Sequence, residues 1–269
     1  MDSYKQRVIE LYNSRTAYDR EIGTTHPDKA RRLLEFVPVR NGQSVLDVAT
    51  GTGLVAIPAA EKVGADGQVM GIDLAPGMLA QAREKISASG LQNIELIEAD
   101  AESIPLNDNQ FDVIFCCEGL VLFADIPASL KKWYGALKPG GFIAFTCPAA
   151  TAYLAPIYRR VCTKLLGASI PHVLDFLGTP DRCRQVLQWA GFNAIAIETE
   201  ISGQYRQPGD RPLPWKWVTL GFKGNPLLST LSPDRIEQFQ AGYRTETKAL
   251  ETDRGIWQET TTFFVRACK

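Results

Sequence analysis

The chain has 269 residues, of which 45% are hydrophobic and 22% are charged, and its formal net charge is -1. This length and composition are typical of a globular protein with a sizeable buried core. A nucleic-acid partner or an anionic membrane surface would call for clustered Lys and Arg, and the sequence has no such basic stripe. We therefore expect neither partner.

The N-terminal stretch is polar, and apolar residues recur in it at helical spacing. Residues 3–38 are predicted to form two helices on this pattern. The stretch lacks the apolar core of a signal peptide, and no apolar run in the sequence is long enough to cross a bilayer. We expect a cytoplasmic protein without an integral membrane segment.

Strand-like and helix-like runs alternate from residue 44 onwards. Apolar runs that predict strands lie at residues 44–48, 68–73, 93–99, 111–117 and 142–147. Helices are predicted between them at residues 54–62, 76–89 and 127–137, and KPGG (residues 138–141) is predicted to make a turn. This alternation is typical of an α/β fold with a doubly wound, mostly parallel sheet.

The pattern changes after residue 148. Residues 149–178 are predicted to be helical, residues 180–201 return to the sheet, and residues 203–258 form an insertion rich in Pro and Trp. The chain ends on an alternating strand at residues 260–268. We predict a single domain over residues 1–269. Its core sheet is assigned to residues 40–147, 180–201 and 260–268, and its helical cap to residues 1–38, 149–178 and 203–258.

A glycine-containing turn directly follows the first strand, in VLDVATGTG (residues 45–53). Ligands of open α/β sheets bind beyond the carboxyl ends of the strands, and glycine lets the backbone approach them. The helix that follows offers free N–H groups to an anionic group. Gly51 and Gly53 also fit a dinucleotide fingerprint, so this loop alone predicts a Rossmann-like nucleotide site.

Acidic residues end the second and third predicted strands. Asp73 can accept hydrogen bonds from ribose hydroxyls, as happens with NAD and with other adenosine ligands. Asp100 would lie beside it and can accept the exocyclic amine of an adenine, with the backbone N–H of Ala101 donating to the ring. Glu118 follows the fourth strand, where the reactive end of a ligand would lie.

Four motifs in order carry a resemblance to a known family: VLDVATGTG, GIDLAPGML (residues 71–79), EADAESIPLNDNQFDVI (residues 98–114) and LKPGG. The sequence resembles the class I S-adenosylmethionine-dependent methyltransferases, in particular the ubiquinone/menaquinone-biosynthesis type and related small-molecule enzymes. The resemblance is strongest over residues 40–147. The N-terminal segment expected of the quinone type is not recognisable in residues 1–40. The insertion at residues 203–258 is outside the minimal family pattern.

The resemblance implies a seven-stranded sheet with an antiparallel last strand, S-adenosylmethionine as cofactor and a small-molecule methyl acceptor. The resemblance implies that Gly51 and Gly53 hold the methionine part of the cofactor, with Asp47 supporting the loop, and that Asp73 binds the ribose. It also implies that Leu74 and Met78 pack on the adenosine and that Asp100 and Ala101 read the adenine. Glu118 completes the predicted cofactor-binding set.

Methyl transfer to a hydroxyl or a carbon acid usually needs a general base, whereas an amine needs only to be unprotonated. Glu118, His172 and His26 are the candidate bases. Each also has a purely structural interpretation: Glu118 as a solvated loop acid, and the histidines as satisfied structural groups. Which element receives the methyl group, and the oligomeric state, stay open.

Other interpretations start from the same loop. An NAD(P)-dependent oxidoreductase would use Gly51, Gly53 and Asp73, although no hydride-transfer motif is present; a non-catalytic binding subunit would keep only the fold. The six cysteines form no C-x-x-C pair and the two histidines lie far apart, so we expect reduced thiols and no metal site.

Overall fold

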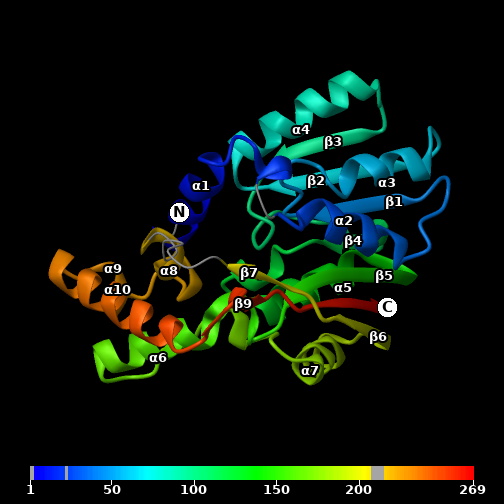
Figure 1. Cartoon of the computed structure of the whole chain (residues 1–269). Helices are drawn as coiled ribbons and strands as arrows, with labels where there is room; N and C mark the ends of the chain where they lie inside the picture. The colour runs from blue at the N-terminus through cyan, green and yellow to red at the C-terminus, as the bar shows by residue number, and fades with distance from the viewer. Residues whose placement is uncertain (1–2, 22–23, 207–214) are drawn as a thin grey trace. The chain divides into compact units, whose positions relative to one another are not determined.

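A computed structural model describes residues 3–21, 24–206 and 215–269 (Figure 1). Over these residues, seven strands form one sheet in the order β3-β2-β1-β4-β5-β10-β6. The strands are β1 (Ser44–Val48), β2 (Gln68–Asp73), β3 (Ile94–Glu98), β4 (Phe111–Cys116), β5 (Leu137–Pro148), β6 (Asn193–Glu200) and β10 (Thr262–Cys268). The predicted seven-stranded α/β sheet is confirmed.

The sheet is parallel except at its last strand. Strand β1 pairs in parallel with β2 and β4, β2 pairs with β3, and β4 pairs with β5. Strand β10 runs the other way. The amide of Lys269 bonds to the carbonyl of Gly141 near the start of β5, while the amide of Ala149, just after β5, bonds to the carbonyl of Thr261. The predicted antiparallel last strand is confirmed.

One expectation about β5 is wrong. The sequence predicts a turn at residues 138–141 and a strand from residue 142, but β5 already begins at Leu137. The amide of Gly140 and the carbonyl of Gly141 both pair with the backbone of Lys269. The physical reason is that the antiparallel neighbour β10 extends to this end of β5, so the glycines continue the ladder.

Helices flank the sheet. They are α1 (Ser3–Asn13), α2 (His26–Glu35), α3 (Ala56–Val63), α4 (Pro76–Ser89), α5 (Ile126–Ala136) and α7 (Pro180–Ala190), with 3-10 turns η1 (Tyr18–Arg20) and η2 (Leu120–Leu122). Leu33 of α2, Ala59 of α3 and Phe115 of β4 belong to one buried apolar cluster. Helices α2 and α3 therefore cover the same face of the sheet, as the apolar spacing of their sequences requires.

The chain folds as two compact units. Unit 1 comprises Met1–Arg7, Pro148–Thr179 and Thr199–Phe263, and unit 2 comprises Val8–Cys147, Pro180–Glu198 and Phe264–Lys269. Residues 8–38 cluster in unit 2 with most of the seven-stranded sheet. Every residue that lines the candidate site described below lies in unit 2.

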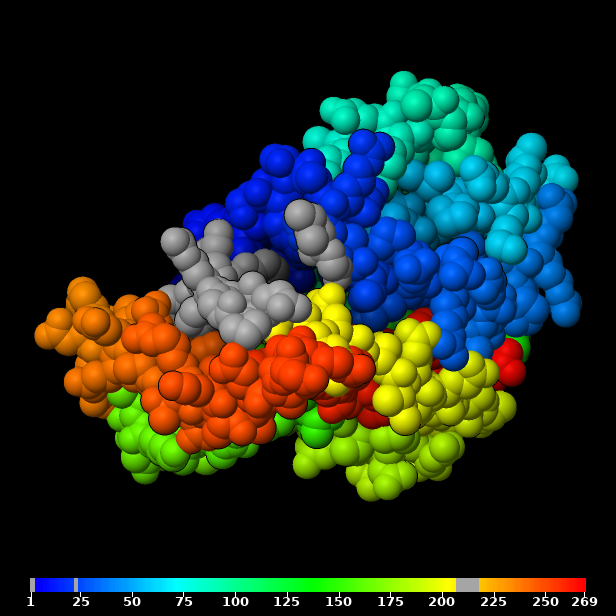
Figure 2. Space-filling view, viewed as in Figure 1, coloured from blue at the N-terminus to red at the C-terminus, as the bar shows by residue number. Residues whose placement is uncertain are grey.

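Unit 1 holds the remaining elements. They are η3 (Ala152–Leu154), α6 (Ala155–Leu166), η4 (Val173–Asp175), β7 (Gly203–Arg206), α8 (Trp215–Gly221), α9 (Pro226–Ser229), α10 (Pro233–Lys248), β8 (Glu251–Thr252) and β9 (Gly255–Glu259). Helices α6 and α10 pack together through stacked rings: that of Tyr158 lies 6.0 Å from Phe239 and 4.9 Å from Tyr243. Both helices reach the molecular surface (Figure 2). Strands β7, β9 and β8 form a small antiparallel sheet.

All six cysteines are free thiols. Cys147 at the end of β5 and Cys183 on α7 are fully buried, and their sulfur atoms lie 3.5 Å apart. Burial raises the pKa of Cys147 well above its ordinary value. Among the helices described, none has the length and apolar character needed to span a membrane.

Candidate functional site

The loop after β1 has the backbone conformation that its glycines permit. Gly51 has φ of +55° and Gly53 has φ of +80°, both in the left-handed region. A side chain added at Gly51 would meet no atom within 4 Å, whereas one at Gly53 would press on Ile57 at 2.9 Å. The backbone at Gly51 therefore faces open space, and Gly53 allows close packing against α3.

Asp47 supports this loop from inside the sheet. It is 1% exposed, and its Oδ2 accepts hydrogen bonds from Thr50 Oγ1 at 2.7 Å and from the amide of Ala56 at 3.0 Å. Its Oδ1 is buried and has no hydrogen-bond partner. Burial raises the pKa of Asp47 to about 7, although both hydrogen bonds act against this. The free oxygen leaves room for one more donor.

Asp73 ties the ends of β1 and β2 together. Its Oδ2 accepts the amide of Gly51 at 2.7 Å, and its Oδ1 accepts the amide of Ala75 at 2.8 Å. Burial raises the pKa of Asp73, and the backbone hydrogen bonds oppose the rise. A carboxylate has about four lone-pair sites, so each oxygen can accept a second donor.

The other predicted cofactor residues lie around this edge of the sheet. Leu74 is half-buried, whereas Met78 is 1% exposed and belongs to the apolar core. Asp100 and Ala101 follow β3; Asp100 Oδ1 accepts the amide of Glu102 at 2.9 Å, and Ala101 is 7% exposed. The amide of Ala99 bonds to the carbonyl of Asp73, which holds the ends of β2 and β3 side by side.

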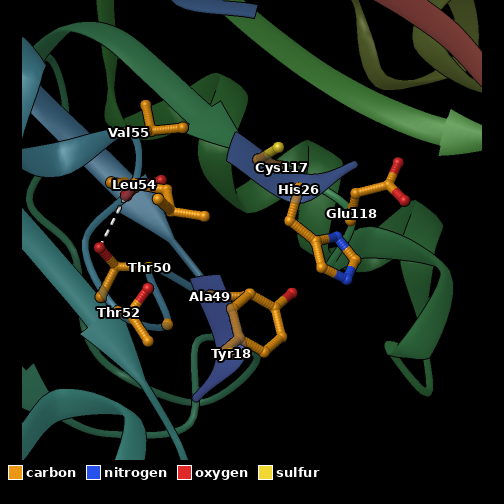
Figure 3. A pocket seen from close by; sticks show the side chains of 11 residues that line it. Tyr18, His26, Ala49, Thr50, Thr52, Leu54, Val55, Cys117 and Glu118 are labelled. Atoms are coloured by element: carbon orange, nitrogen blue, oxygen red, sulfur yellow. Dashed lines mark hydrogen bonds between the residues drawn. The ribbon is translucent and has the colours of Figure 1, made fainter. Parts of the chain in front are cut away.

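A cavity of about 30 Å³ lies at the glycine loop (Figure 3). Its walls come from the loop and from η1, the start of α2 and the end of β4. They are Tyr18, His26, Asp47, Ala49, Thr50, Gly51, Thr52, Leu54, Val55, Cys117 and Glu118. Such a space holds a terminal group of a ligand, not a whole nucleoside. Of the predicted site residues, the structure brings Asp47, Gly51, Glu118 and His26 together here.

Glu118 is held by a lysine that the sequence analysis missed. Its Oε2 accepts Lys29 Nζ at 2.8 Å, and its Oε1 is buried without a partner. The backbone of Glu118 is left-handed, with φ of +59°, and its amide donates to Thr146 Oγ1 at 2.8 Å. Burial alone would raise the pKa of Glu118, but the charge of Lys29 lowers it, as does the attraction of His26 when that ring is protonated. Glu118 is therefore a weak base.

The signal for Lys29 was present in the sequence. Lys29 lies one helical turn before Leu33, on the apolar face of α2, and it is only 2% exposed. A lysine on such a face is almost never fully buried without a charged partner. The partner lies 89 positions away, so sequence spacing could not identify it.

His26 faces the same cavity. Its ring stacks on that of Tyr18, with centroids 4.6 Å apart and planes 9° from parallel, and its Nδ1 is buried without a hydrogen-bond partner. Burial lowers the pKa of His26, and Glu118 opposes this by attraction. The imidazole is therefore neutral at pH 7. Figure 3 shows the two rings side by side at the mouth of the glycine loop.

The turn that carries Tyr18 is fastened to the glycine loop and to α4. Asp19 accepts hydrogen bonds from Thr52 Oγ1 at 2.5 Å and from Lys85 Nζ at 2.7 Å. Asn13 Oδ1 accepts the amide of Gly77 at 2.8 Å, in the first turn of α4. These long-range bonds fix the position of the Tyr18 ring beside His26.

His172, the third candidate base, lies in unit 1 and does not line this cavity. Its Nδ1 accepts the amide of Leu174 at 3.2 Å, and its own amide donates to Asp175 Oδ2 at 2.7 Å, which together cap η4. Burial, followed by repulsion from Arg159, lowers the pKa of His172 to about 4. Its proton-accepting nitrogen is already occupied, which is the arrangement of a structural histidine.

Comparison with known proteins adds to this geometry. A family model described as a methyltransferase domain matches residues 45–141. Aklanonic acid methyltransferase DauC from Streptomyces sp. (strain C5) is 36% identical over 169 residues, which cover 62% of this chain and 77% of that protein. The chain belongs to the class I S-adenosylmethionine-dependent methyltransferases.

Two further likenesses accompany this methyltransferase. Nocamycin O-methyltransferase from Saccharothrix syringae is 29% identical over 204 residues, covering 70% of this chain and 72% of that protein. A phosphoethanolamine N-methyltransferase 2 from Haemonchus contortus has the same fold, with a TM-score of 0.64 at 19% identity; the match covers all of this chain and 60% of that one.

The family decides between the interpretations that the glycine loop left open. The protein is an enzyme that transfers a methyl group from S-adenosylmethionine to a small-molecule acceptor. The expectation of this activity is confirmed, and neither the oxidoreductase nor the non-catalytic subunit is supported. The residues that hold the cofactor and those that act on the acceptor are a matter of proposal.

Proposed function

We propose that the cavity at the glycine loop receives the amino-acid end of S-adenosylmethionine. The observation that carries this is the pair of buried carboxylate oxygens without partners, Asp47 Oδ1 and Glu118 Oε1, on the wall of one 30 Å³ space. A buried, unpaired acceptor is costly, and an ammonium group supplies the missing donors. The site therefore fits this cofactor.

The remaining cofactor contacts follow the edge of the sheet. The open backbone at Gly51 and the close packing at Gly53 let the loop lie against the cofactor, and the spare lone pairs of Asp73 accept the ribose hydroxyls. Leu74 packs on the adenosine, Met78 supports that surface from the core, and Asp100 with the amide of Ala101 reads the adenine. When bound, the cofactor supplies an electrophilic methyl group on a sulfonium.

Glu118 serves in this proposal as an anchoring charge. Its ion pair with Lys29 and its lowered pKa make it a poor proton acceptor, so we do not retain it as the base. His172 is assigned to the cap of η4. The role left to Glu118 is to hold the positive end of the ligand beside Asp47.

The acceptor that we propose is an oxygen of a small organic molecule, of the kind made as a secondary metabolite. The support comes from two relatives, named for aklanonic acid and for O-methylation of nocamycin. The chain's own residues orient the acceptor and exclude water; correct placement of the two reactants is worth about 7–11 kcal/mol in favourable cases.

Calorimetric titration with S-adenosylhomocysteine, and separately with NADH, tests the cofactor site. We expect micromolar binding of S-adenosylhomocysteine and none of NADH. Asp73→Asn should weaken that binding about tenfold or more, because an amide nitrogen replaces one acceptor. Asp112→Asn is the matched control, since Asp112 also accepts a backbone amide and a lysine, but at the opposite end of the strands. Equal losses in both variants would refute the ribose assignment.

A further inference from the structure

His26 combines three properties that a structural histidine lacks. Its Nδ1 is buried and has no partner, its ring borders the cavity, and the backbone of its own helix does not use the imidazole. Buried polar atoms without partners are rare in folded proteins. An atom of this kind in a residue that lines a cavity points to a role in ligand binding or catalysis.

The ring is also fixed in place. The Tyr18 ring stacks on one face of the imidazole, with the ring centroids 4.6 Å apart. The guanidinium of Arg15 lies 4.2 Å from the centroid of the same Tyr18 ring. Arg15 is in turn paired with Glu21. A base that must meet an acceptor atom in one geometry benefits from such restraint.

The Lys29–Glu118 ion pair controls the charge around His26. Lys29 follows His26 by three positions on α2, and Glu118 reaches the same place from the end of β4. After Lys29, His26 is the group whose charge most lowers the pKa of Glu118. A carboxylate that pairs with an imidazole favours the protonated ring, which has no lone pair to offer.

Four charged groups influence the pKa of His26. Glu118 from the end of β4 and Glu21 after η1 favour the imidazolium. Lys29 on the same helix and Arg15 before η1 favour the neutral ring, as does burial, the largest influence. Tyr18 stays neutral, because burial raises its pKa well above the ordinary value.

We propose that His26 is the base that accepts a proton from a hydroxyl of the methyl acceptor, and that the buried Lys29–Glu118 ion pair keeps its imidazole free to do so. The O–H bond of the acceptor breaks, the proton forms a bond to the free imidazole nitrogen, and the electron pair stays on the oxygen that takes the methyl group. The resulting imidazolium returns its proton to solvent. This rests on the proposed function.

A base of this kind suits an acceptor that is a phenol or an enol. A carboxylic acid has already lost its proton at neutral pH, and an amine needs only to be bound unprotonated, so neither requires a buried neutral base. His26 is thus a catalytic residue, and Lys29 is a positioning residue that acts through Glu118.

The histidine protonation states can be measured directly, because the sequence contains only two histidines. Nitrogen-15 NMR of the uniformly labelled, cofactor-free protein would follow both rings from pH 4 to pH 8, with His172→Ala assigning the signals. We expect His26 to be neutral at pH 7, with one ring nitrogen at the shift of a free lone pair. A protonated His26 at pH 7 would overturn the proposal.

Two variants should move the pKa of His26 in opposite directions. Lys29→Met removes a repelling charge and frees Glu118, so the pKa should rise by about 1. Glu118→Gln removes the attracting charge, so the pKa should fall. Lys29→Arg should restore the original value, and Lys138→Met is the matched control, since Lys138 pairs with Asp112 elsewhere in the same unit.

A purely structural pair would leave the pKa of His26 unchanged, or shift it the same way in both variants, and either result refutes the proposal. If Lys29→Met fails to fold, the double variant with Glu118→Gln removes both charges and should leave the pKa of His26 lower than in Lys29→Arg. The titration contains no cofactor. Its failure is therefore distinct from failure of the proposed function, which the binding of S-adenosylhomocysteine tests.

Discussion

Two regions of the molecule each hold one of the two histidines half-buried, and the contacts of the two rings differ. In unit 1, the Nδ1 of His172 accepts a hydrogen bond from the amide of Leu174 and caps a short turn. In unit 2, the Nδ1 of His26 is buried without a partner, and His26 lines a cavity. The difference shows that burial alone does not identify a functional histidine. What matters is whether its nitrogens already have partners.

The largest expected effect comes from exchanging the two histidines for alanine in turn. His26→Ala should lower turnover about 100- to 10,000-fold, which is the usual contribution of a general base. His172→Ala should leave turnover nearly unchanged and lower the free energy of unfolding by about 1 kcal/mol, the cost of a lost cap. Initial rates with phenols as trial acceptors give the effect on turnover, and chemical denaturation gives the effect on stability. Equal loss of turnover in both variants would erase the distinction.

The next largest expected effect comes from replacing Asp47, in unit 2, with alanine. Asp47→Ala removes two buried hydrogen bonds and one proposed contact to the cofactor, so the affinity for S-adenosylhomocysteine should fall about 100-fold. The melting temperature should fall as well, because Thr50 and Ala56 lose their acceptor. Calorimetry and thermal unfolding measure the two effects. Affinity within a factor of two of the original would show that the free Oδ1 does not meet the ligand.

Thr146→Val should have a smaller effect on stability and on cofactor binding in unit 2. The valine keeps the shape of Thr146 but leaves the buried amide of Glu118 without an acceptor, which should cost about 1–3 kcal/mol of stability. Because Glu118 has a left-handed backbone, this loss should also loosen the Lys29 pair and weaken binding of S-adenosylhomocysteine several-fold. Thr261→Val, in unit 1, is a suitable control, since the Thr261 hydroxyl is buried without a partner.

The smallest expected effect is the release of a fraction of a proton from Asp47 when the ligand binds. The pKa of Asp47 is about 7 in the free protein, against about 3.9 in an unfolded chain. Because the folded pKa is raised, Asp47 stabilises the fold below pH 4 and loses this contribution as the pH rises through 7. A bound ammonium would lower the pKa again, so binding at pH 7 should release up to about half a proton. Calorimetry in buffers of different ionisation heat measures this, and Asp47→Asn should abolish it.

The parts of the site that sequence analysis predicted are local in the chain. Asp47, Gly51 and Gly53 lie within seven residues, and the motif fixes their geometry because a strand, a turn and a helix follow one another there. Asp73 is found because parallel strands end at the same edge of a sheet. The antiparallel last strand came from the family resemblance, since alternation alone does not give strand direction.

The parts that escaped prediction depend on long-range contacts. Lys29 and Glu118 meet only after α2 packs on the sheet, and the stack of Tyr18 on His26 forms in a turn that Asp19 bonds to Thr52, 33 positions away. The extension of β5 to Leu137 required a partner strand from the end of the chain. Glu118 was correctly placed at the end of β4, but its ion pair, which decides what it can do chemically, was invisible in the sequence.

The two sulfur atoms of Cys147 and Cys183, 3.5 Å apart and fully buried, give the core of unit 2 a built-in reporter. A thiol reacts with an alkylating agent only as an exposed thiolate; burial removes both thiols from solvent and raises the pKa of Cys147 well above its ordinary value. Their rate of alkylation therefore reports how often α7 separates locally from the sheet. A ligand that binds only the unopened state lowers this rate as its occupancy rises, so its affinity can be measured without a methyl acceptor.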